Sequence, residues 1–255
     1  DVGTFMREWL SLYDSKSGER GIYNGMSAKK TVEQLNERYK DDDGKFITRR
    51  ATREDFGTNP CSEIILRSRE FCNLSECVVR REDTRESLKE KVRTAAILGT
   101  FQSTLTEFKY LSREWKKNCD EERLLGVSLT GIMDNPLTNG SKKGLDKLLE
   151  ELRTVAYETN KEWADKLGIP VSAAITCVKP SGTVSQLVDS ASGIHARHNP
   201  YYIRTVRADN KDPLCKLMKN MGFPNEIDVT KPAHTTVFSF PMKSPKGAVC
   251  RMDMT

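Results

Sequence analysis

Hydrophobic residues recur every three to four positions over residues 144–167, and this spacing predicts an amphipathic helix with one apolar face. Gly168 and Pro170 follow at once and end the helix. The chain then enters residues 171–178, a short run of β type that predicts a buried strand. A helix that leads directly into a strand is typical of a crossover in a parallel α/β sheet.

Similar patterns predict the other elements. Helices are expected around Phe5–Leu12, over residues 27–40, from Thr84 through Gly99 to Phe108, and over residues 213–221. Strands are expected over residues 71–79 and 235–240, the last halting at Pro241, and the apolar segment 124–133 predicts another buried strand or turn. Asp41–Asp43 form a solvated turn after the second helix, and Gly126 and Gly131 permit close approach of other backbone.

The most informative stretch is residues 57–77, which opens with a Gly-Thr-Asn-Pro turn signal and so predicts an irregular loop. Cys61 and Glu63 lie at the tip of that loop, and Asn59 precedes the cysteine by two positions. An apolar run, Ile64–Leu66, then anchors the loop in a core. A thiol, a carboxylate and a carboxamide crowded on one tip are costly to bury, so the pattern indicates a chemical role.

A second candidate site is the segment Lys179–Ser185, which follows the expected strand and precedes a possible helix start. Small residues with free backbone N–H groups in such a place favour phosphate binding. An ordinary strand-to-helix turn is the alternative interpretation, because the tetrapeptide alone is a weak signal.

Composition narrows the classes of function. The 255 residues include 41 basic and 36 acidic side chains, and the net charge of +5 is spread along the chain, which suits a polyanionic small substrate but not nucleic-acid binding. No apolar run is long enough to span a membrane, and the N-terminus lacks the features of a secretory signal. Seven unevenly spaced cysteines favour reduced thiols in the cytoplasm.

The missing initiator Met suggests that the chain begins within a longer protein.

The stretch Asn59-Pro60-Cys61-x-Glu63, with Cys72 eleven residues after Cys61, resembles the finger loop of ribonucleotide reductases. The KPSGT segment and residues 193–207 resemble the same family. The resemblance implies an α/β fold that is part of a ten-stranded α/β barrel. In this interpretation residues 1–255 form a single partial barrel domain, composed of a pre-finger segment (1–56), the finger and redox-cysteine strand (57–77) and the second half-barrel (78–255).

The resemblance also implies roles for the residues of the tip. Cys61 would carry a thiyl radical that takes the 3′ hydrogen of a ribonucleotide, from a buried position that excludes other hydrogen donors. Glu63 would accept the proton of the 3′ hydroxyl, and Asn59 would orient a sugar hydroxyl. The alternatives are a small buried hydrophobe for Cys61, an exposed carboxylate for Glu63 and plain turn chemistry for Asn59.

Cys72 would supply reducing equivalents as half of a dithiol that becomes a disulfide in each turnover. Its partner is expected in a missing part of the protein, because no cysteine precedes Cys61. Cys77 is no substitute, since two residues five apart on an extended strand lie about 16 Å apart. No metal site is expected, because the cysteines lack the spacing of zinc ligands and no histidine lies near them.

Ser181, Gly182 and Thr183 become the expected substrate-phosphate ligands. The sequences of these motifs most resemble those of the class II ribonucleotide reductases, which depend on adenosylcobalamin. The resemblance therefore implies adenosylcobalamin as cofactor, a ribonucleoside triphosphate as substrate and a dithiol such as thioredoxin as reductant. The missing N- and C-terminal parts of the same chain are the other expected partners, with no membrane and no direct nucleic-acid contact.

Two alternatives stay open. One is a metal-subunit-dependent (class I) ribonucleoside-diphosphate reductase, which has nearly the same finger. The other is a truncated reductase that only binds nucleotide. A basic nucleic-acid-binding module is a distant third, because aromatic and basic residues are not interleaved.

Overall fold

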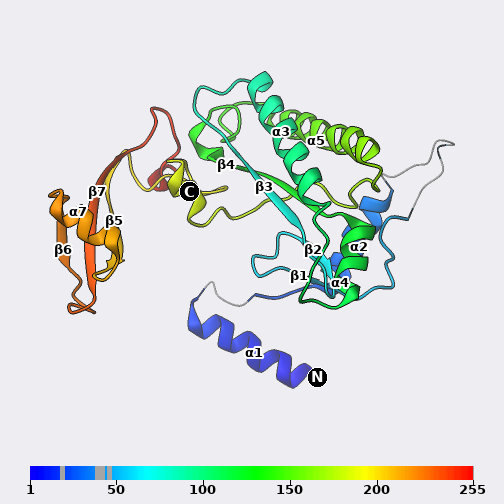
Figure 1. Ribbon diagram of the computed structural model, residues 1–255, viewed down its shortest axis with the longest axis horizontal. Helices are drawn as coiled ribbons and strands as arrows, with labels where there is room; N and C mark the ends of the chain where they lie inside the picture. Colours follow the sequence, from blue (N-terminus) through cyan, green and yellow to red (C-terminus); the bar gives the residue numbers. More distant parts are fainter. Residues whose placement is uncertain (18–20, 38–43, 45–47, 255) are drawn as a thin grey trace.

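The computed structural model describes residues 1–17, 21–37, 44 and 48–254. Two parallel strands lie beneath the two long helices of the fold (Figure 1). The two strands are β3 (Asn73–Val78) and β4 (Leu125–Thr130). They pair in parallel with Asn73 opposite Leu125 and Val78 opposite Thr130. Both predicted strands are therefore confirmed.

The predicted strand over residues 171–178 runs parallel to β4 but pairs with it irregularly. The backbone N–H of Leu125 donates to the carbonyl of Ala174 at 2.9 Å, and that of Val127 donates to Ile175 at 2.8 Å. Between these two bonds β4 advances by two residues while its neighbour advances by one, so no regular ladder forms. Only the bridge between Val127 and Thr176 has regular parallel pairing.

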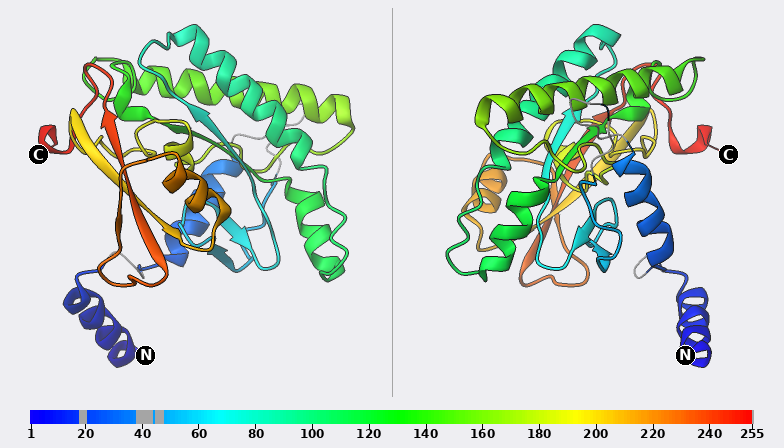
Figure 2. Two further views of the ribbon diagram at one scale, coloured as in Figure 1. Left: turned by 60° about the vertical axis from the view of Figure 1, so that its left-hand side comes forward. Right: turned by 90° about the vertical axis from the view of Figure 1, so that its right-hand side faces the viewer.

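Two long helices cover one face of these strands. Helix α3 (Arg85–Gln102) connects β3 toward β4, and α5 (Leu145–Leu167) connects β4 to the third extended segment. The helices pack against each other and α3 packs on both strands (Figures 1 and 2). Their shared core is made of Cys77, Val79, Leu88, Val92, Ala95, Ala96, Leu125, Val127, Leu148, Leu152, Ala156 and Ile175. The predicted crossover helix is thus present, but residues 171–178, which follow it, form an extended segment with one isolated bridge instead of the predicted strand.

Helix α3 begins as predicted, with the Thr84 hydroxyl accepting a hydrogen bond from the Ser87 N–H at 3.3 Å. The predicted continuation to Phe108 is wrong, because the helix ends at Gln102. There the hydroxyls of Ser103 and Thr104 each donate to a carbonyl three residues back, both at 2.7 Å. Side-chain bonds of this kind compete with further helical turns.

Helix α4 (Arg113–Glu122) was not predicted, because its ten residues are almost all polar and show no apolar period. Its two apolar residues, Trp115 and Cys119, both contact Phe71, which lies just before β3. The Trp115 ring stacks on Phe71 with centroids 4.5 Å apart, and the Cys119 sulfur accepts a hydrogen bond from the Phe71 N–H at 3.4 Å. This helix therefore holds the residue that directly precedes Cys72.

The two glycines of the second strand differ in what approaches them. A Cβ on Gly131 (φ +78°) would lie 2.4 Å from the carbonyl oxygen of Val79, so the predicted close approach of backbone is confirmed there. A Cβ on Gly126 would lie 2.5 Å from Cδ2 of Leu74 and 3.2 Å from Cδ1 of Ile64. At Gly126 side chains, rather than backbone, fill the space.

The two N-terminal helices differ in their contact with the finger. Helix α1 (Val2–Ser15) has no buried residue and lies apart from the body, whereas α2 (Gly25–Asn36) packs on the finger hairpin (Figures 1 and 2). Both helices were predicted. The expected end of the second, at residues 38–40, and the Asp41–Asp43 turn lie outside the described residues.

A three-stranded antiparallel sheet lies to one side of the helices (Figure 1). It has the order β5 (Tyr201–Asp209), β7 (Thr235–Lys243) and β6 (Asn225–Ile227), with α7 (Pro213–Asn220) as predicted. Strand β7 does not halt at Pro241, which pairs with Ile203. Strand β6 pairs with β7 only up to Phe238, so the missing N–H of Pro241 breaks no bond on that side.

Three short helices complete the description: the 3₁₀ turns η1 (Ile132–Asp134) and η2 (Arg251–Asp253), and α6 (Val184–Leu187). Across the part of the chain described, none of the helices combines the length and the apolar character needed to cross a membrane.

Candidate active site

The finger is a short hairpin with an irregular tip. Strands β1 (Phe56–Thr58) and β2 (Ile65–Arg67) pair antiparallel, and the predicted loop joins them. Within the tip the side-chain oxygen of Asn59 accepts a hydrogen bond from the Ile64 N–H at 3.1 Å. Ser62 adopts a left-handed conformation with φ 62°. Asn59 therefore has the structural role in the turn that was the alternative to a catalytic role. Its Oδ1 fixes the shape of the tip.

A buried charge cluster supports the base of the finger. Arg50 is 1% exposed, and its Nε lies 2.7 Å from Glu122 of α4 while its Nη2 donates to the carbonyl of Ile65 at 2.9 Å. Arg67 joins the cluster from β2, with its Nε 3.0 Å from Glu122. Buried charges need partners of this kind, so the cluster ties the hairpin to α4.

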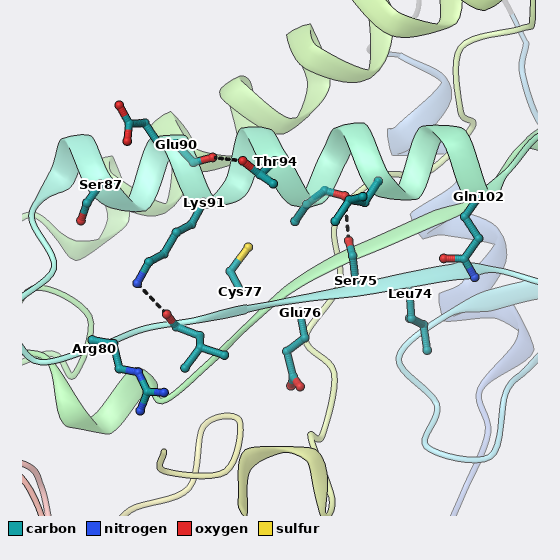
Figure 3. Close-up of a pocket in the computed structure, with 13 residues that line it drawn as sticks. Leu74, Ser75, Glu76, Cys77, Arg80, Ser87, Glu90, Lys91, Thr94 and Gln102 are labelled. Atoms are coloured by element: carbon teal, nitrogen blue, oxygen red, sulfur yellow. Dashed lines mark hydrogen bonds between the residues drawn. The ribbon is translucent and has the colours of Figure 1, made fainter. Parts of the chain in front are cut away.

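The apolar run after the tip lies on the face of the sheet opposite the helices. Ile64 is buried there with Leu124 and Ala173, which confirms the predicted anchor. In Figure 3 the side chains of Ser75 and Cys77 point toward α3, whereas those of Leu74 and Glu76 point away from it. Side chains alternate along a strand, so the face turned away from α3 is the finger face.

Cys72 belongs to the finger face and packs against the same small core as Ile64. Burial, followed by the negative charge of Glu63, raises the pKa of the Cys72 thiol to about 11. Cys77 faces the helices instead, and burial raises its pKa to about 12. The two cysteines thus lie on opposite faces of β3, in agreement with the prediction that they form no disulfide.

Glu63 is the most unusual residue of the tip. Its side chain is only 2% exposed, and its carboxylate Oε1 lies 2.9 Å from the Nζ of Lys179. Neither carboxylate oxygen makes a hydrogen bond of good geometry within the described chain. Burial by itself raises the pKa of Glu63, but Lys179, the local backbone and the Asn59 amide together outweigh burial and lower it. Glu63 is therefore a buried carboxylate that stays ionised.

Cys61 is exposed, so the expectation of a buried thiol is wrong for this structure. Lys179 is close enough to the thiol for Cys61 to contribute to the raised pKa of the lysine, after the larger contribution of Glu63. The tip therefore presents a reachable thiol beside a buried carboxylate.

Residues 179–183 lie where the parallel strands end. Ser181 is buried and its hydroxyl is 3.1 Å from that of Ser192, while Gly182 and Thr183 are exposed. The N–H of Gly193 donates to the Thr130 hydroxyl at 2.8 Å, which ties the neighbouring loop to the end of β4. Ligands of α/β sheets commonly bind outside the carboxyl ends of the strands. Phosphate binding by these three residues stays a prediction.

Sequence reasoning gave Cys177 no role, and it placed Lys179 in the candidate phosphate segment without predicting its contact with the finger. Lys179 joins the 179–183 loop to the finger, and Cys177 lies on the finger face beside Gly126, with a pKa raised to about 12 by burial and by Glu63. Their position directly before the Pro-Ser-Gly-Thr turn was a signal, because residues at a strand end face the same edge as the finger. In the described ranges, no cluster of three or more His, Cys, Asp or Glu side chains is placed to hold a metal ion.

Comparison with known proteins gives a consistent result. The chain is 29% identical over 213 residues to the adenosylcobalamin-dependent ribonucleoside-triphosphate reductase of Lactobacillus delbrueckii subsp. bulgaricus, covering 74% of this chain and 28% of that protein. Proteins of the same name from Euglena gracilis and Lacticaseibacillus paracasei are 29% and 28% identical, over 78% and 92% of this chain and 27% and 33% of theirs. The chain thus spans a third or less of these relatives. No profile of a known family matches it.

The fold points the same way. The crystal structure of a B12-dependent (class II) ribonucleotide reductase superposes with a TM-score of 0.64 at 27% identity, covering 76% of this chain and 30% of that one. The chain is therefore similar in sequence and fold to proteins of the ribonucleotide reductase family over most of its length, and its fold is consistent with part of their α/β barrel, as predicted. Within the family, its relatives are the adenosylcobalamin-dependent class II reductases.

Proposed function

We propose that this chain is part of an enzyme that reduces ribonucleoside triphosphates to 2′-deoxyribonucleotides by thiyl-radical chemistry, with adenosylcobalamin as cofactor. The observation that supports this proposal best is the finger tip, where an exposed Cys61 thiol lies beside the buried, ionised carboxylate of Glu63. Such a pair has no evident structural purpose, because a buried charge costs free energy. It fits a reaction that needs a sulfur radical and a base at one sugar.

Cys61 takes the first step. As a thiyl radical it removes the 3′ hydrogen atom of the ribose, which leaves a thiol on Cys61 and a carbon radical at C3′. An exposed sulfur at the narrow tip can reach both a substrate and a radical source. Adenosylcobalamin supplies the radical chemistry when it is bound.

Glu63 takes the proton of the 3′ hydroxyl, which eases loss of the 2′ hydroxyl from the sugar radical. The carboxylate must be ionised for this role, and its lowered pKa keeps it so near neutral pH. Asn59 shapes the tip through its Oδ1, and its amide N–H₂ is the part proposed to orient a sugar hydroxyl.

Cys72 supplies reducing equivalents as one thiol of a dithiol. Its position on the finger face of β3, beside the core that carries Ile64, supports this role. Its raised pKa keeps the resting sulfur protonated, so it is a poor nucleophile but a source of hydrogen. The second thiol, an external dithiol such as thioredoxin and the remaining parts of the protein are proposed partners, in the cytoplasm.

Ser181, Gly182 and Thr183 are proposed to bind the substrate phosphates. The support is their place at the carboxyl ends of the parallel strands and the contact of the preceding Lys179 with the finger. Residues 1–255 are proposed to form one partial barrel domain, with the finger lying over residues of the 78–255 half-barrel such as Gly126.

The test is deoxynucleotide formation by the protein that contains this chain, under anaerobic conditions with a dithiol and a ribonucleoside triphosphate. Product that forms only when adenosylcobalamin is added supports the proposal. Product that forms without cobalamin, from a diphosphate and with an added metal subunit, supports the class I alternative instead. Nucleotide binding without any product would leave only a binding role.

A further inference from the structure

We propose that Lys179 is a positioning residue of this site: its ammonium group holds Glu63 as a carboxylate and fixes the finger tip against the 179–183 loop. The inference rests on the proposed function only for its consequence in the reaction, because the ion pair itself is a property of the chain. Lys179 would act through Glu63 rather than on the substrate itself.

The backbone on both sides of this contact is firmly held. Lys179 follows the extended segment that hydrogen-bonds to β4, where the Cys177 N–H donates to the Val127 carbonyl at 3.0 Å. On the other side, Ile64 anchors the tip in a buried core directly after Glu63. The 2.9 Å contact between Lys179 and Glu63 therefore joins two segments that are distant in sequence and fixed independently.

The charges around Glu63 make Lys179 necessary. Among the described residues, Cys72 and Cys177 interact with both Glu63 and Lys179, and Lys179 also interacts with Cys61 on the tip and Glu76 of β3. Lys179 is the only basic group among them. Its removal would leave a 2%-exposed carboxylate with no cation from this group, supported only by the local backbone and the Asn59 amide. Burial would then dominate and Glu63 would take up a proton.

The geometry also leaves one carboxylate oxygen of Glu63 as an unused hydrogen-bond acceptor. The Lys179 ammonium occupies the side of Oε1. The other oxygen, Oε2, is buried and makes no hydrogen bond of good geometry in the described part of the chain. A hydroxyl placed over the tip could therefore donate to Oε2 while Lys179 keeps the carboxylate in position. A neutral Glu63 would instead carry a proton and could not act as a base.

The experiment titrates Glu63 directly, by carboxyl-carbon NMR of this chain labelled at the side-chain carboxyl of glutamate. The Glu63 signal is assigned from its loss in Glu63→Gln. In the wild type its midpoint should lie below the ordinary value of about 4.5, and in Lys179→Met it should rise by about one to three pH units, above that value. Lys179→Arg should retain the low midpoint, as should Lys143→Met, which removes an exposed lysine elsewhere. An unchanged Glu63 midpoint in folded Lys179→Met would overturn the proposal.

A second measurement covers the case in which Lys179→Met folds poorly. The stability lost on Lys179→Met is compared in the wild type and in the Glu63→Gln background by urea unfolding. A positioning role through Glu63 predicts that the loss largely disappears when the carboxylate is already absent. An equal loss in both backgrounds would mean that Lys179 acts through other contacts, and the inference would fail.

The reduction assay separates this inference from the proposed function. In the protein that contains this chain, Lys179→Met should shift the acidic limb of the pH–rate profile upward with little change in KM. A raised KM with an unmoved profile would assign Lys179 to phosphate binding and would contradict the inference. If no nucleotide is reduced by the wild type, the proposed function fails, yet the NMR titration still decides the role of Lys179.

Discussion

The charge cluster beneath the finger shows how single residues decide the local architecture. Glu70 and Glu122 are both buried, and Arg50 and Arg67 lie between them. Burial, and then the negative charge of Glu122, raises the pKa of Glu70 to about 8. The N–H of Arg67 donates to Glu70 at 2.8 Å, so this carboxyl also closes the turn between β2 and β3. The turn leads directly to Cys72.

The raised pKa of Glu70 predicts a pH dependence of stability. In the folded chain Glu70 binds its proton more tightly than in the unfolded chain, where the pKa is about 4.5. Its contribution to stability is therefore fully present below about pH 4.5 and is lost as the pH rises through about 8. Urea midpoints measured from pH 5 to 9 should fall less steeply for Glu70→Gln than for the wild type. Parallel pH profiles for the two proteins would contradict this prediction.

At the scale of elements, glycines set how closely segments approach. Gly131 lies at the end of β4, where its positive φ turns the chain into η1 and its missing side chain admits the Val79 carbonyl. Gly140 has a similar φ of +81°, but no atom lies within 4 Å of the position that a side-chain carbon would take there. The two positions therefore separate backbone strain from a steric clash.

Gly131→Ala should destabilise the chain more than Gly140→Ala. Both substitutions force alanine into the left-handed region, at a cost of about 1–2 kcal/mol. Gly131→Ala adds a clash with backbone that cannot move aside, which should cost about 1–3 kcal/mol more. The free energy of unfolding in urea measures both. Equal losses would show that the end of β4 relaxes freely.

Sequence patterns were most informative for elements with a marked apolar period. The long helix α5 was predictable because it buries one face, and β4 was predictable because its continuous apolar segment is buried on both faces. The finger tip was predictable from its turn residues and its chemistry. Helix α4 could not be found, since its polar sequence is held by a few contacts such as Trp115 on Phe71. Likewise, the pairing of Glu63 with Lys179 joins residues 116 positions apart, and no local pattern reports such a contact.

At the scale of the whole molecule, the helices and the finger occupy opposite faces of one parallel sheet. Helices α3 and α5 cover one face, and the finger reaches over Gly126 on the other (Figure 1). The 179–183 loop closes the end of that second face through Lys179. This arrangement brings Cys61, Glu63 and Cys72 to one side, which is what the proposed reaction requires.

The most direct test of this account is the requirement for the Cys61 sulfur. Deoxynucleotide formation should be measured with adenosylcobalamin and a dithiol for the wild type, Cys61→Ser, Cys61→Ala and the neighbouring control Ser62→Ala. A hydroxyl is a far poorer source of a stable radical than a thiol, so both Cys61 variants should form no product while still binding nucleotide. Ser62→Ala should retain most of the activity. Reduction by Cys61→Ala at a rate near that of the wild type would contradict the central claim.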